Sequence, residues 1–286
     1  MSSWLHEELS RLGLPMVCVE ARHMQTALAA MRNKTDRNDA RGIGQMMRTG
    51  WFREVHIKST AGQELRLLLV ARRALIDRRR DIENVIRGTL KVFGIRVGQT
   101  TRLNFSRRVR ELVEDRTTIA EIIVPVLKVR DTLMEQMQVL HRKLMNRVRT
   151  DKVCRQLMTA PGVGVVVAAS FKAGVDAPER FNRSRNVGAH FGLTPRRYAS
   201  GEMDRMGRIS KCGDELVRTS LYEAANVLLT RVKRWSTLKA WGMKIARKAG
   251  MQKAKVALAR KLAVILHRMW ADGSDFQWGK AEKVAA

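Results

Sequence analysis

Apolar residues recur every three or four positions through most of the chain, a spacing that predicts a mainly helical protein. The pattern is longest over residues 60–94 and again from Pro125 to residue 150. Two such helices joined by a connector predict an antiparallel coiled-coil arm over residues 58–150, for dimerisation or for spacing with DNA or RNA contacts on its arginine side. The first stripe contains Leu68, Leu75, Ile82, Ile86, Leu90 and Phe93, opposite Arg72, Arg73, Arg78, Arg79 and Arg80; the second contains Val126, Val129, Leu133, Met137, Leu140, Leu144 and Val148.

The first 57 residues predict a small α/β portion. Apolar residues at helical spacing run from Trp4 to Leu12, and Gly13 fits a helix end. A β-prone run at 15–20 follows, then a helical stretch to about residue 31, and residues 51–57 fit a closing strand. This portion is too small to be a complete α/β domain, so we expect a truncated or late-starting version of a longer protein.

Residues 33–40 combine a helix start with two acidic side chains. Thr35 fits an N-cap, and Asp36 and Asp39 would then lie three residues apart in the first helical turn. Two carboxylates so placed can share a divalent cation such as Mg²⁺, which prefers hard oxygen ligands. The helix dipole favours acids in the first turn of any helix, so the pattern alone also fits an ordinary helix start.

The second half predicts a helical domain over residues 151–271 and a tail over 272–286. At its beginning, Pro-Gly-Val-Gly at 161–164 lies between two helices and resembles a helix-hairpin-helix turn. In such a turn the amides of Gly162 and Gly164 would contact phosphate without reading sequence, although a plain interhelical turn fits equally well. Residues 180–192 predict another helix, and residues 215–270 predict helices with breaks near Trp235 and Gly250.

The loop predicted between Leu193 and Lys211 is the feature around which the chain is organised. It places one serine, Ser200, before a glycine on an exposed turn, where an ordinary turn serine is the simplest interpretation. Several cations surround that serine and would supply a positive field for a phosphate, namely Arg196, Arg197, Arg205, Arg208 and Lys211.

The charge distribution points to nucleic acid as the partner. The chain has 55 basic and 27 acidic residues, a net charge of +28. Between Glu223 and Asp272 there is no acidic residue but there are twelve basic ones, including Lys244, Arg247 and Lys248. A solvated helical face normally mixes both signs, so this segment favours a polyanion.

Other classes of protein are not supported. The three cysteines are isolated, which supports neither zinc nor a disulfide framework and is typical of reduced cytosolic thiols. No apolar run approaches the roughly 18 residues needed to span a bilayer, so no membrane partner is expected. The sequence contains no phosphate-binding P-loop and predicts no nucleotide cofactor.

Two blocks of the sequence resemble the transposases of insertion-sequence family one-hundred-ten, the DEDD-type recombinases, whose transposase domain is shared with the one-hundred-sixteen and nine-hundred-two members. The first block is Asn-Lys-Thr-Asp-Arg-Asn-Asp-Ala-Arg at 33–41, followed by Gln-Met-Met at 45–47. The second joins Met-Thr-Ala-Pro-Gly-Val-Gly at 158–164, Phe-Gly-Leu-Thr-Pro at 191–195 and the Ser-Gly block at 200–213. The resemblance covers nearly the whole chain.

This resemblance implies a fold and an activity. Residues 1–57 would be the C-terminal portion of a RuvC-like (RNase H-like) DEDD domain, followed by the coiled-coil arm and a helical transposase domain with the catalytic serine. The family recombines DNA under the direction of a structured bridge RNA from the element. By this resemblance Ser200 is the nucleophile, and Asp36 and Asp39 are the last two of four acids, which would bind Mg²⁺ or Mn²⁺. A bacterial cytoplasmic, nucleoid-associated homodimer or tetramer is implied.

The chain also departs from the family pattern. The family's first two acids lie on and after strands that precede the helix with which this chain begins, and neither has a counterpart here. Glu20 lies in the strand after that helix and is not a substitute. Ser210, beside Lys211, fits a structural or phosphate-contacting position better than a second nucleophile. Two hypotheses therefore remain open, an active RNA-guided DNA transposase and a non-catalytic remnant that binds DNA or RNA.

Overall fold

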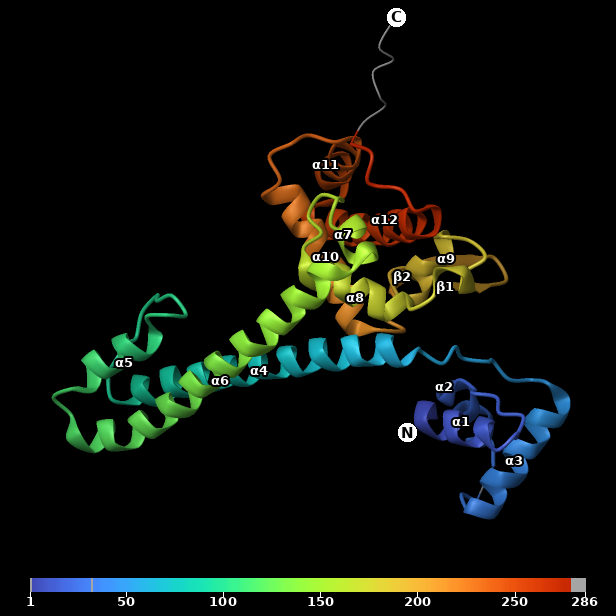
Figure 1. The fold of residues 1–286 in the computed structure, drawn as a ribbon, viewed down its shortest axis with the longest axis horizontal. Coiled ribbons are helices and arrows are strands. Elements are labelled where there is room, and N and C mark those ends of the chain that lie inside the picture. Colours follow the sequence, from blue (N-terminus) through green and yellow to red (C-terminus); the bar gives the residue numbers. More distant parts are fainter. Residues whose placement is uncertain (1, 32, 279–286) are drawn as a thin grey trace, which may run out of the picture. The chain divides into compact units, whose positions relative to one another are not determined.

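The structure is a computed structural model that describes residues 2–31 and 33–278. The chain divides into two compact units, residues 1–60 and 61–286 (Figure 1). Helices dominate both units, as the apolar spacing predicts, and the described part of the chain has one two-stranded antiparallel sheet. No helix in this part is both long and apolar enough to cross a membrane.

The first unit contains three short helices, α1 (Ser2–Arg11), α2 (Ala21–Leu28) and α3 (Asp36–Thr49). The predicted start of α3 is confirmed, because the Thr35 side chain accepts a hydrogen bond from the Asn38 amide at 3.2 Å. This capping bond satisfies one of the amides that the first turn leaves without an intrahelical partner. The local sequence therefore fixes where this helix begins.

The strands expected in the first unit do not form in its described residues. The two β-prone segments meet at a single bridge between Val19 and Glu54. Its hydrogen bonds run from the Glu20 amide to the Arg53 carbonyl at 2.9 Å and from the Val55 amide to the Cys18 carbonyl at 2.8 Å. Two short segments without a third strand or a covered apolar face are marginal as a sheet, which explains why pairing stops after one bridge.

The second unit begins with a pair of long antiparallel helices, α4 (Thr60–Val92) and α6 (Thr117–Thr150). The short helix α5 (Phe105–Val113) lies in the connector between them (Figure 1). Two ion pairs set the antiparallel direction, since the first residues of α4 meet the last turns of α6. Glu64 contacts Arg147 at 3.0 Å, and Glu83 contacts Arg130 at 2.8 Å.

The predicted apolar stripes of this helix pair are correct in part. Ile86 and Leu90 are buried against α5 and against Leu127 of α6, but Phe93 and Val129 are 54% and 55% exposed. The arginine side is also mixed. Arg79 is buried, because it donates two hydrogen bonds of 2.7 Å to the Glu83 carboxylate, to which Arg130 also donates. A buried arginine of this kind requires such a partner.

Helix α6 begins eight residues before Pro125, where the sequence predicted a break. Proline inside a helix removes one hydrogen bond and normally costs about 3 kcal/mol. Here the side chains of Ile123 and Leu127, on either side of the proline, are buried in the cluster that covers α5. Packing of these residues offsets the cost of the proline, so the helix continues through it.

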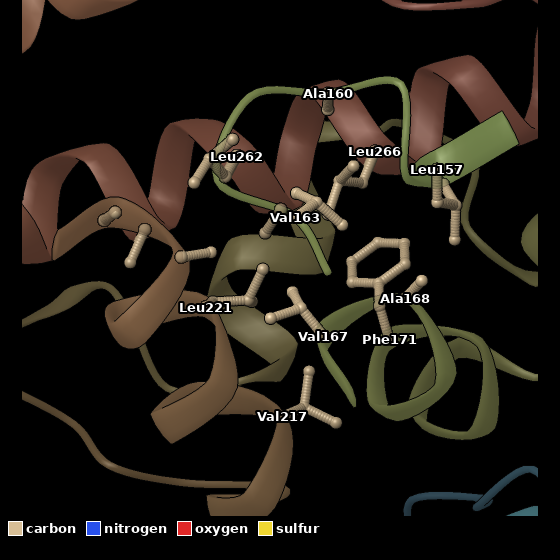
Figure 2. Close-up of a cluster of buried hydrophobic side chains, with 14 of the residues drawn as sticks. Leu157, Ala160, Val163, Val167, Ala168, Phe171, Val217, Leu221, Leu262 and Leu266 are labelled. Atoms are coloured by element: carbon tan, nitrogen blue, oxygen red, sulfur yellow. The ribbon is translucent and has the colours of Figure 1, made fainter. Parts of the chain in front are cut away.

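The remaining helices enclose the main core. They are α7 (Lys152–Leu157), α8 (Val165–Val175), a 3-10 turn (Pro178–Arg180), α9 (Arg185–His190), α10 (Glu215–Thr230), α11 (Thr237–Ala249) and α12 (Met251–Asp272). The breaks predicted near Trp235 and Gly250 are confirmed, whereas the helix predicted over 180–192 is limited to α9. Figure 2 shows the ring of Phe171 from α8 pointing toward Leu157 of α7 and Leu266 of α12, and all three side chains are fully buried.

The segment predicted as a loop between Leu193 and Lys211 is a β-hairpin. Strand β1 (Pro195–Ser200) pairs antiparallel with β2 (Met203–Ile209). The turn contains only Gly201 and Glu202, and Gly201 has a φ of 54°, a conformation that favours glycine at the first position of a tight hairpin turn. Ser200 is therefore the last residue of a strand, directly across from Met203.

Candidate active site and nucleic-acid surface

Alternation of side chains along the hairpin separates its residues into two faces. Ser200 and Tyr198 on β1 face the same side as their partners on β2, Met203 and Arg205. The Arg205 guanidinium lies over the Tyr198 ring, 5.8 Å from its centroid. One face of the hairpin thus presents a hydroxyl, an aromatic ring and a cation together.

The opposite face carries a neutralised charge pair. Arg197 donates to both carboxylate oxygens of Asp204, at 2.8 and 2.9 Å. Hydrogen bonding to Asp204 raises the pKa of Arg197. Arg197 was predicted to contact nucleic acid, but the Asp204 carboxylate neutralises its positive charge. Arg205 has no ion pair within residues 2–31 and 33–278, so its charge remains available to a phosphate. Arg196 instead donates to the Ser210 carbonyl at 3.3 Å.

Two glycines fix the base of the hairpin on the core. Gly192 and Gly213 have φ values of 66° and 73°. A Cβ on Gly192 would collide with the backbone of Cys212, and one on Gly213 would collide with the His190 carbonyl. Because the two chain segments pass this closely, each position requires glycine. Phe191 next to Gly192 is fully buried, so the base of the hairpin is fixed while its tip is exposed.

The Ser200 hydroxyl is exposed and makes no hydrogen bond to any residue in the described part of the chain. No histidine or carboxylate among residues 61–278 is therefore hydrogen-bonded to it. Ser210 differs, because its hydroxyl accepts a long hydrogen bond of 3.5 Å from the Cys212 amide at the hairpin base. Of the two serines, Ser200 is the one available to an incoming phosphate.

A cavity of about 1080 Å³ lies between β2 and helices α11 and α12. Two of the predicted cations, Arg208 and Lys211, line it from the hairpin side. Trp241 lines it from α11, and Lys261 of α12 lies over the indole ring at 5.5 Å. Lys261 is one of the twelve basic residues that favour a polyanion, but neither Trp241 nor Tyr198 was predicted from the sequence as a site residue. The alternation of side chains along a strand could have placed Tyr198 on the same face as Ser200. The cavity is lined by segments far apart in the sequence, so no local sequence pattern could have predicted it.

Helix α11 carries the other predicted cations. Lys244, Arg247 and Lys248 are all exposed. None of them has an ion pair with a residue that the structure describes, in keeping with the absence of acids from Ala224 to Ala271. This surface can attract a phosphate backbone but cannot by itself select a sequence.

The Pro-Gly-Val-Gly turn has a clear packing role. Gly162 has a φ of 82°, and a Cβ there would collide with the Ala224 carbonyl of α10. Close packing therefore explains this glycine without a phosphate. Gly164 is exposed at the N-cap of α8, and the hollow of about 590 Å³ that it lines with Gly162 also contains Glu223. A carboxylate at this place weakens an anion site, so the structure favours the plain interhelical turn.

The two acids predicted as metal ligands both lie in the first turn of α3. Asp36 is exposed and Asp39 is half-buried. No cluster of three or more His, Cys, Asp or Glu suited to a metal occurs among the residues that the structure describes. Two accessible carboxylates fit Mg²⁺ or Mn²⁺ only if water and substrate phosphate complete the coordination, which is a common arrangement for Mg²⁺.

The cysteines are free thiols in this structure. Cys154 is buried, and burial raises the pKa of its thiol to about 12, with a smaller contribution from Asp151. A thiol that stays protonated at neutral pH is a poor nucleophile, so Cys154 contributes packing alone.

Comparison with known proteins identifies the family. Residues 154–240 match the transposases of the IS116/IS110/IS902 family, and residues 2–95 match the DEDD-type transposases of IS110. The transposase for insertion sequence element IS1111A of Coxiella burnetii is 30% identical over 275 residues, which cover 91% of this chain and 71% of that protein. The chain belongs to the IS110/IS116/IS902 family of transposases.

Other transposases are also similar to this chain. The transposase y4pF/y4sB of Sinorhizobium fredii is 30% identical over 258 residues, covering 88% of this chain and 66% of that protein. The transposase for insertion sequence element IS1328 of Yersinia enterocolitica is 31% identical over 145 residues, covering 50% and 43%. The match to residues 154–240 includes the whole hairpin with Ser200, and the match to residues 2–95 includes Asp36 and Asp39.

Proposed function

We propose that this transposase cuts and rejoins DNA strands with Ser200 as the nucleophile. The observation that carries the proposal is the Ser200 hydroxyl, exposed at the tip of a hairpin whose base is fixed on the core, with Arg205 on the same face. An exposed serine in a positive field is suited to attack a DNA phosphate, because the developing charge on the phosphorus oxygens needs cations nearby.

In this reaction the Ser200 oxygen attacks the phosphorus and loses its proton, while the bond from phosphorus to the departing deoxyribose oxygen breaks and that oxygen gains a proton. The product is a phosphoserine ester that retains the energy of the original linkage. A second DNA hydroxyl can then attack this ester and restore Ser200, so rejoining requires no nucleotide cofactor. Arg205, on the same face of the hairpin as Ser200, would stabilise the negative charge that develops in both steps.

We assign the deprotonation of Ser200 to a metal site, because no described histidine or carboxylate forms a hydrogen bond with this serine. Asp36 and Asp39 of α3 are the proposed source, because they are hard oxygen ligands that fit Mg²⁺ or Mn²⁺ together with phosphate and water. The metal, when bound, lowers the pKa of a coordinated oxygen and stabilises phosphoryl charge. The residues of this chain hold the cation through these carboxylates, from the same subunit or from another.

The rest of the chain would hold the nucleic acids. We assign DNA and a structured element-encoded RNA to the exposed cations of α11, Lys244, Arg247 and Lys248, and only secondarily to Gly162 and Gly164, because Gly162 has a packing role. The antiparallel helix pair would form a coiled-coil arm between a RuvC-like portion and the transposase domain. Exchange of strands between two duplexes requires two serines, which favours a homodimer or tetramer.

A second candidate is a transposase relative that binds nucleic acid without cutting it. It is favoured by the two carboxylates of α3, which have no third ligand among the residues that the structure describes. Such a protein would keep the basic surfaces of α11 and α12 and bind DNA or RNA, while Ser200 would be an ordinary turn serine.

The variant Ser200→Ala separates the two candidates. We expect it to lower strand cleavage at the element ends by at least roughly 1000-fold and to abolish the covalent protein–DNA adduct seen on a denaturing gel, with DNA affinity unchanged. Ser210→Ala is the matched control, because its hydroxyl lies in the same segment, and it should retain cleavage. If wild-type protein with element DNA, its RNA and Mg²⁺ forms no adduct, the binding candidate replaces the transposase proposal.

A further inference from the structure

The cavity beside the hairpin differs from the exposed basic surfaces because it has apolar walls. Leu193 and Pro195 line it from the base of the hairpin, Met206 from β2, and Val256 and Val264 from α12. The cavity volume of about 1080 Å³ is large for a single small ligand. Its apolar walls favour an occupant with flat or apolar groups.

The charges around these walls have one sign. Among the residues that the structure describes, five cations and no acid line the cavity; the cations are Arg208, Lys211, Lys253, Arg260 and Lys261. An occupant that combines apolar faces with regularly spaced negative charges satisfies both properties at once. Unpaired nucleotides have these features, since each has an aromatic base and a phosphate.

Trp241 supplies a surface on which a base can stack. Its side chain is partly exposed, at 38%, and it lies in the wall of the cavity with the Lys261 ammonium 5.5 Å from its ring centroid. Indole rings are good stacking partners for every base, and a neighbouring lysine can contact the adjoining phosphate. Gln252 is a neutral polar side chain in the same wall.

Strand β2 connects the position opposite Ser200 to the wall of the cavity. Strand β2 begins at Met203, opposite Ser200, and its residues Met206 to Ile209 line the cavity. At about 3.3 Å per residue, roughly 10–20 Å separate the serine from this wall, the span of about three to six stacked nucleotides. Met206 lies on the face of the hairpin opposite Ser200, so a strand whose phosphate lies at Ser200 must pass the edge of the hairpin and needs at least a few nucleotides to reach the cavity.

We propose that this cavity binds an unpaired stretch of the DNA strand on which Ser200 acts, with a base stacked on Trp241 and phosphates along the five cations. The proposal rests on the proposed function, because it takes DNA as the substrate. DNA is preferred to the chain's own segments because the cavity has no acid and the chain has an excess of cations, which the cavity would repel. An unpaired strand is preferred to duplex because paired bases have no free face to offer to Trp241.

Binding of labelled oligonucleotides to the chain of residues 1–286 tests this proposal. Fluorescence anisotropy with a single-stranded DNA, the same sequence as duplex, and the same sequence as RNA gives three dissociation constants for each variant. Trp241→Ala should weaken single-stranded DNA binding by roughly 5- to 100-fold, as expected for loss of one stacked base, and change duplex binding less than about 2-fold. Trp241→Phe, which keeps an aromatic face, should restore most of the affinity.

Trp235→Ala is the matched control. Trp235 is also an exposed tryptophan beside a lysine, with Lys239 at 5.5 Å from its ring, but it does not line the cavity. Its loss should leave all three affinities unchanged. Crosslinking of single-stranded DNA containing 5-iododeoxyuridine, followed by mass spectrometry, should attach the DNA to Trp241 and not to Trp235.

The outcomes separate this proposal from the proposed function. Equal effects of Trp241→Ala and Trp235→Ala, or a loss confined to the RNA oligonucleotide, would overturn the cavity assignment while Ser200-dependent cleavage could still stand. A change in oligomeric state on Trp241→Ala, measured by light scattering, would assign the cavity to a second copy of the chain instead. If the wild-type protein binds none of the three nucleic acids, the proposed function fails together with the cavity.

Discussion

The two units of this transposase differ sharply in how much of their apolar surface they cover. In the described part of the first unit, Met46 is the one buried hydrophobic side chain, while Trp4, Leu12 and Trp51 are 64%, 75% and 65% exposed. In the second unit a large buried cluster joins the start of α4, the end of α6 and side chains from each helix between α7 and α12, and Phe171 within this cluster is fully buried (Figure 2).

This difference bears on the proposed chemistry because each unit supplies part of it. Ser200 belongs to the packed unit, where Gly192 and Gly213 fix the hairpin base, so its position follows from the core. Asp36 and Asp39 belong to a unit whose helices bury little surface. Since each fully buried large side chain contributes about 1.5–3 kcal/mol, the first unit has little to hold its acids in one geometry. We therefore expect DNA, metal or another polypeptide surface to help place these two acids in the proposed reaction.

The largest expected effect tests the difference in packing directly. Phe171→Ala removes a fully buried ring and should lower the free energy of unfolding by about 3–5 kcal/mol. Trp4→Ala removes a larger ring that is 64% exposed and should change it by less than about 0.5 kcal/mol. Urea denaturation of the full chain, followed by far-ultraviolet circular dichroism, measures both.

Equal losses of stability in the two variants would show that Trp4 is covered in solution. The comparison between a packed and a sparsely packed unit would then be wrong. Phe171→Leu serves as a control for side-chain volume, because a leucine fills much of the same space and should recover part of the lost stability.

A smaller effect tests whether the two units share one reaction. Asp39→Asn removes a negative charge from the proposed metal site while keeping the size of the side chain. We expect roughly a 100-fold loss of strand cleavage, about 2.7 kcal/mol in the activation barrier, with stability and DNA affinity almost unchanged. Gel assays of cleavage over a range of Mg²⁺ concentrations measure this, since partial rescue at high Mg²⁺ is expected for a weakened site.

The control is Asp77→Asn in α4, where the Asp77 carboxylate forms an ion pair with the Arg73 guanidinium at 2.8 Å. It should cleave at the wild-type rate. Suppose that Asp39→Asn cleaves at the wild-type rate while Ser200→Ala does not cleave. The reaction would then depend on the second unit alone, and the proposed role of the first unit in binding the metal would be wrong.

The sequence predicted the elements in which local signals agree. The cap at Thr35, the change of helix at Gly250 and the long helices α4 and α6 each follow from the spacing of apolar residues and a local start or stop residue. The family was also identifiable, because short blocks around Asp36 and Ser200 keep their order and spacing. Each of these features can be predicted from residues that lie within a few positions of it in the sequence.

Other features depend on partners far along the chain. Arg79 is buried because Glu83 and, from α6, Arg130 complete its ion-pair network, and Pro125 is accepted because its neighbours pack on α5. The hairpin was mistaken for a loop since its strands are short, polar and exposed, which gives no apolar alternation. The cavity with Trp241 arises only when α11, α12 and β2 meet, so no local pattern contained it.

The smallest expected effect is the contribution of Asp151 to the stability of the second unit at acid pH. Its carboxylate caps α7 by accepting from the Cys154 amide at 2.9 Å and also pairs with Lys172 of α8. Burial by itself raises the pKa of Asp151, but the hydrogen bonds from Lys172 and Cys154 outweigh burial and hold the pKa below its ordinary value. A carboxylate with a lowered pKa stabilises the fold above about pH 4, and this stability is lost as pH falls through the folded-state pKa.

Asp151→Asn keeps a side-chain oxygen for the cap and removes only the charge, so it isolates the ionic contribution. Near neutral pH it should lower the free energy of unfolding by less than about 1 kcal/mol, because solvent screens a partly exposed pair. Below about pH 4 the variant and the wild type should converge. Lys172→Met should produce the same convergence, and the double variant should be less destabilised than the sum of the two. Fully additive losses in urea denaturation from pH 7 to pH 3 would show that Asp151 and Lys172 are not coupled, and that the packed unit draws its stability from apolar contacts alone.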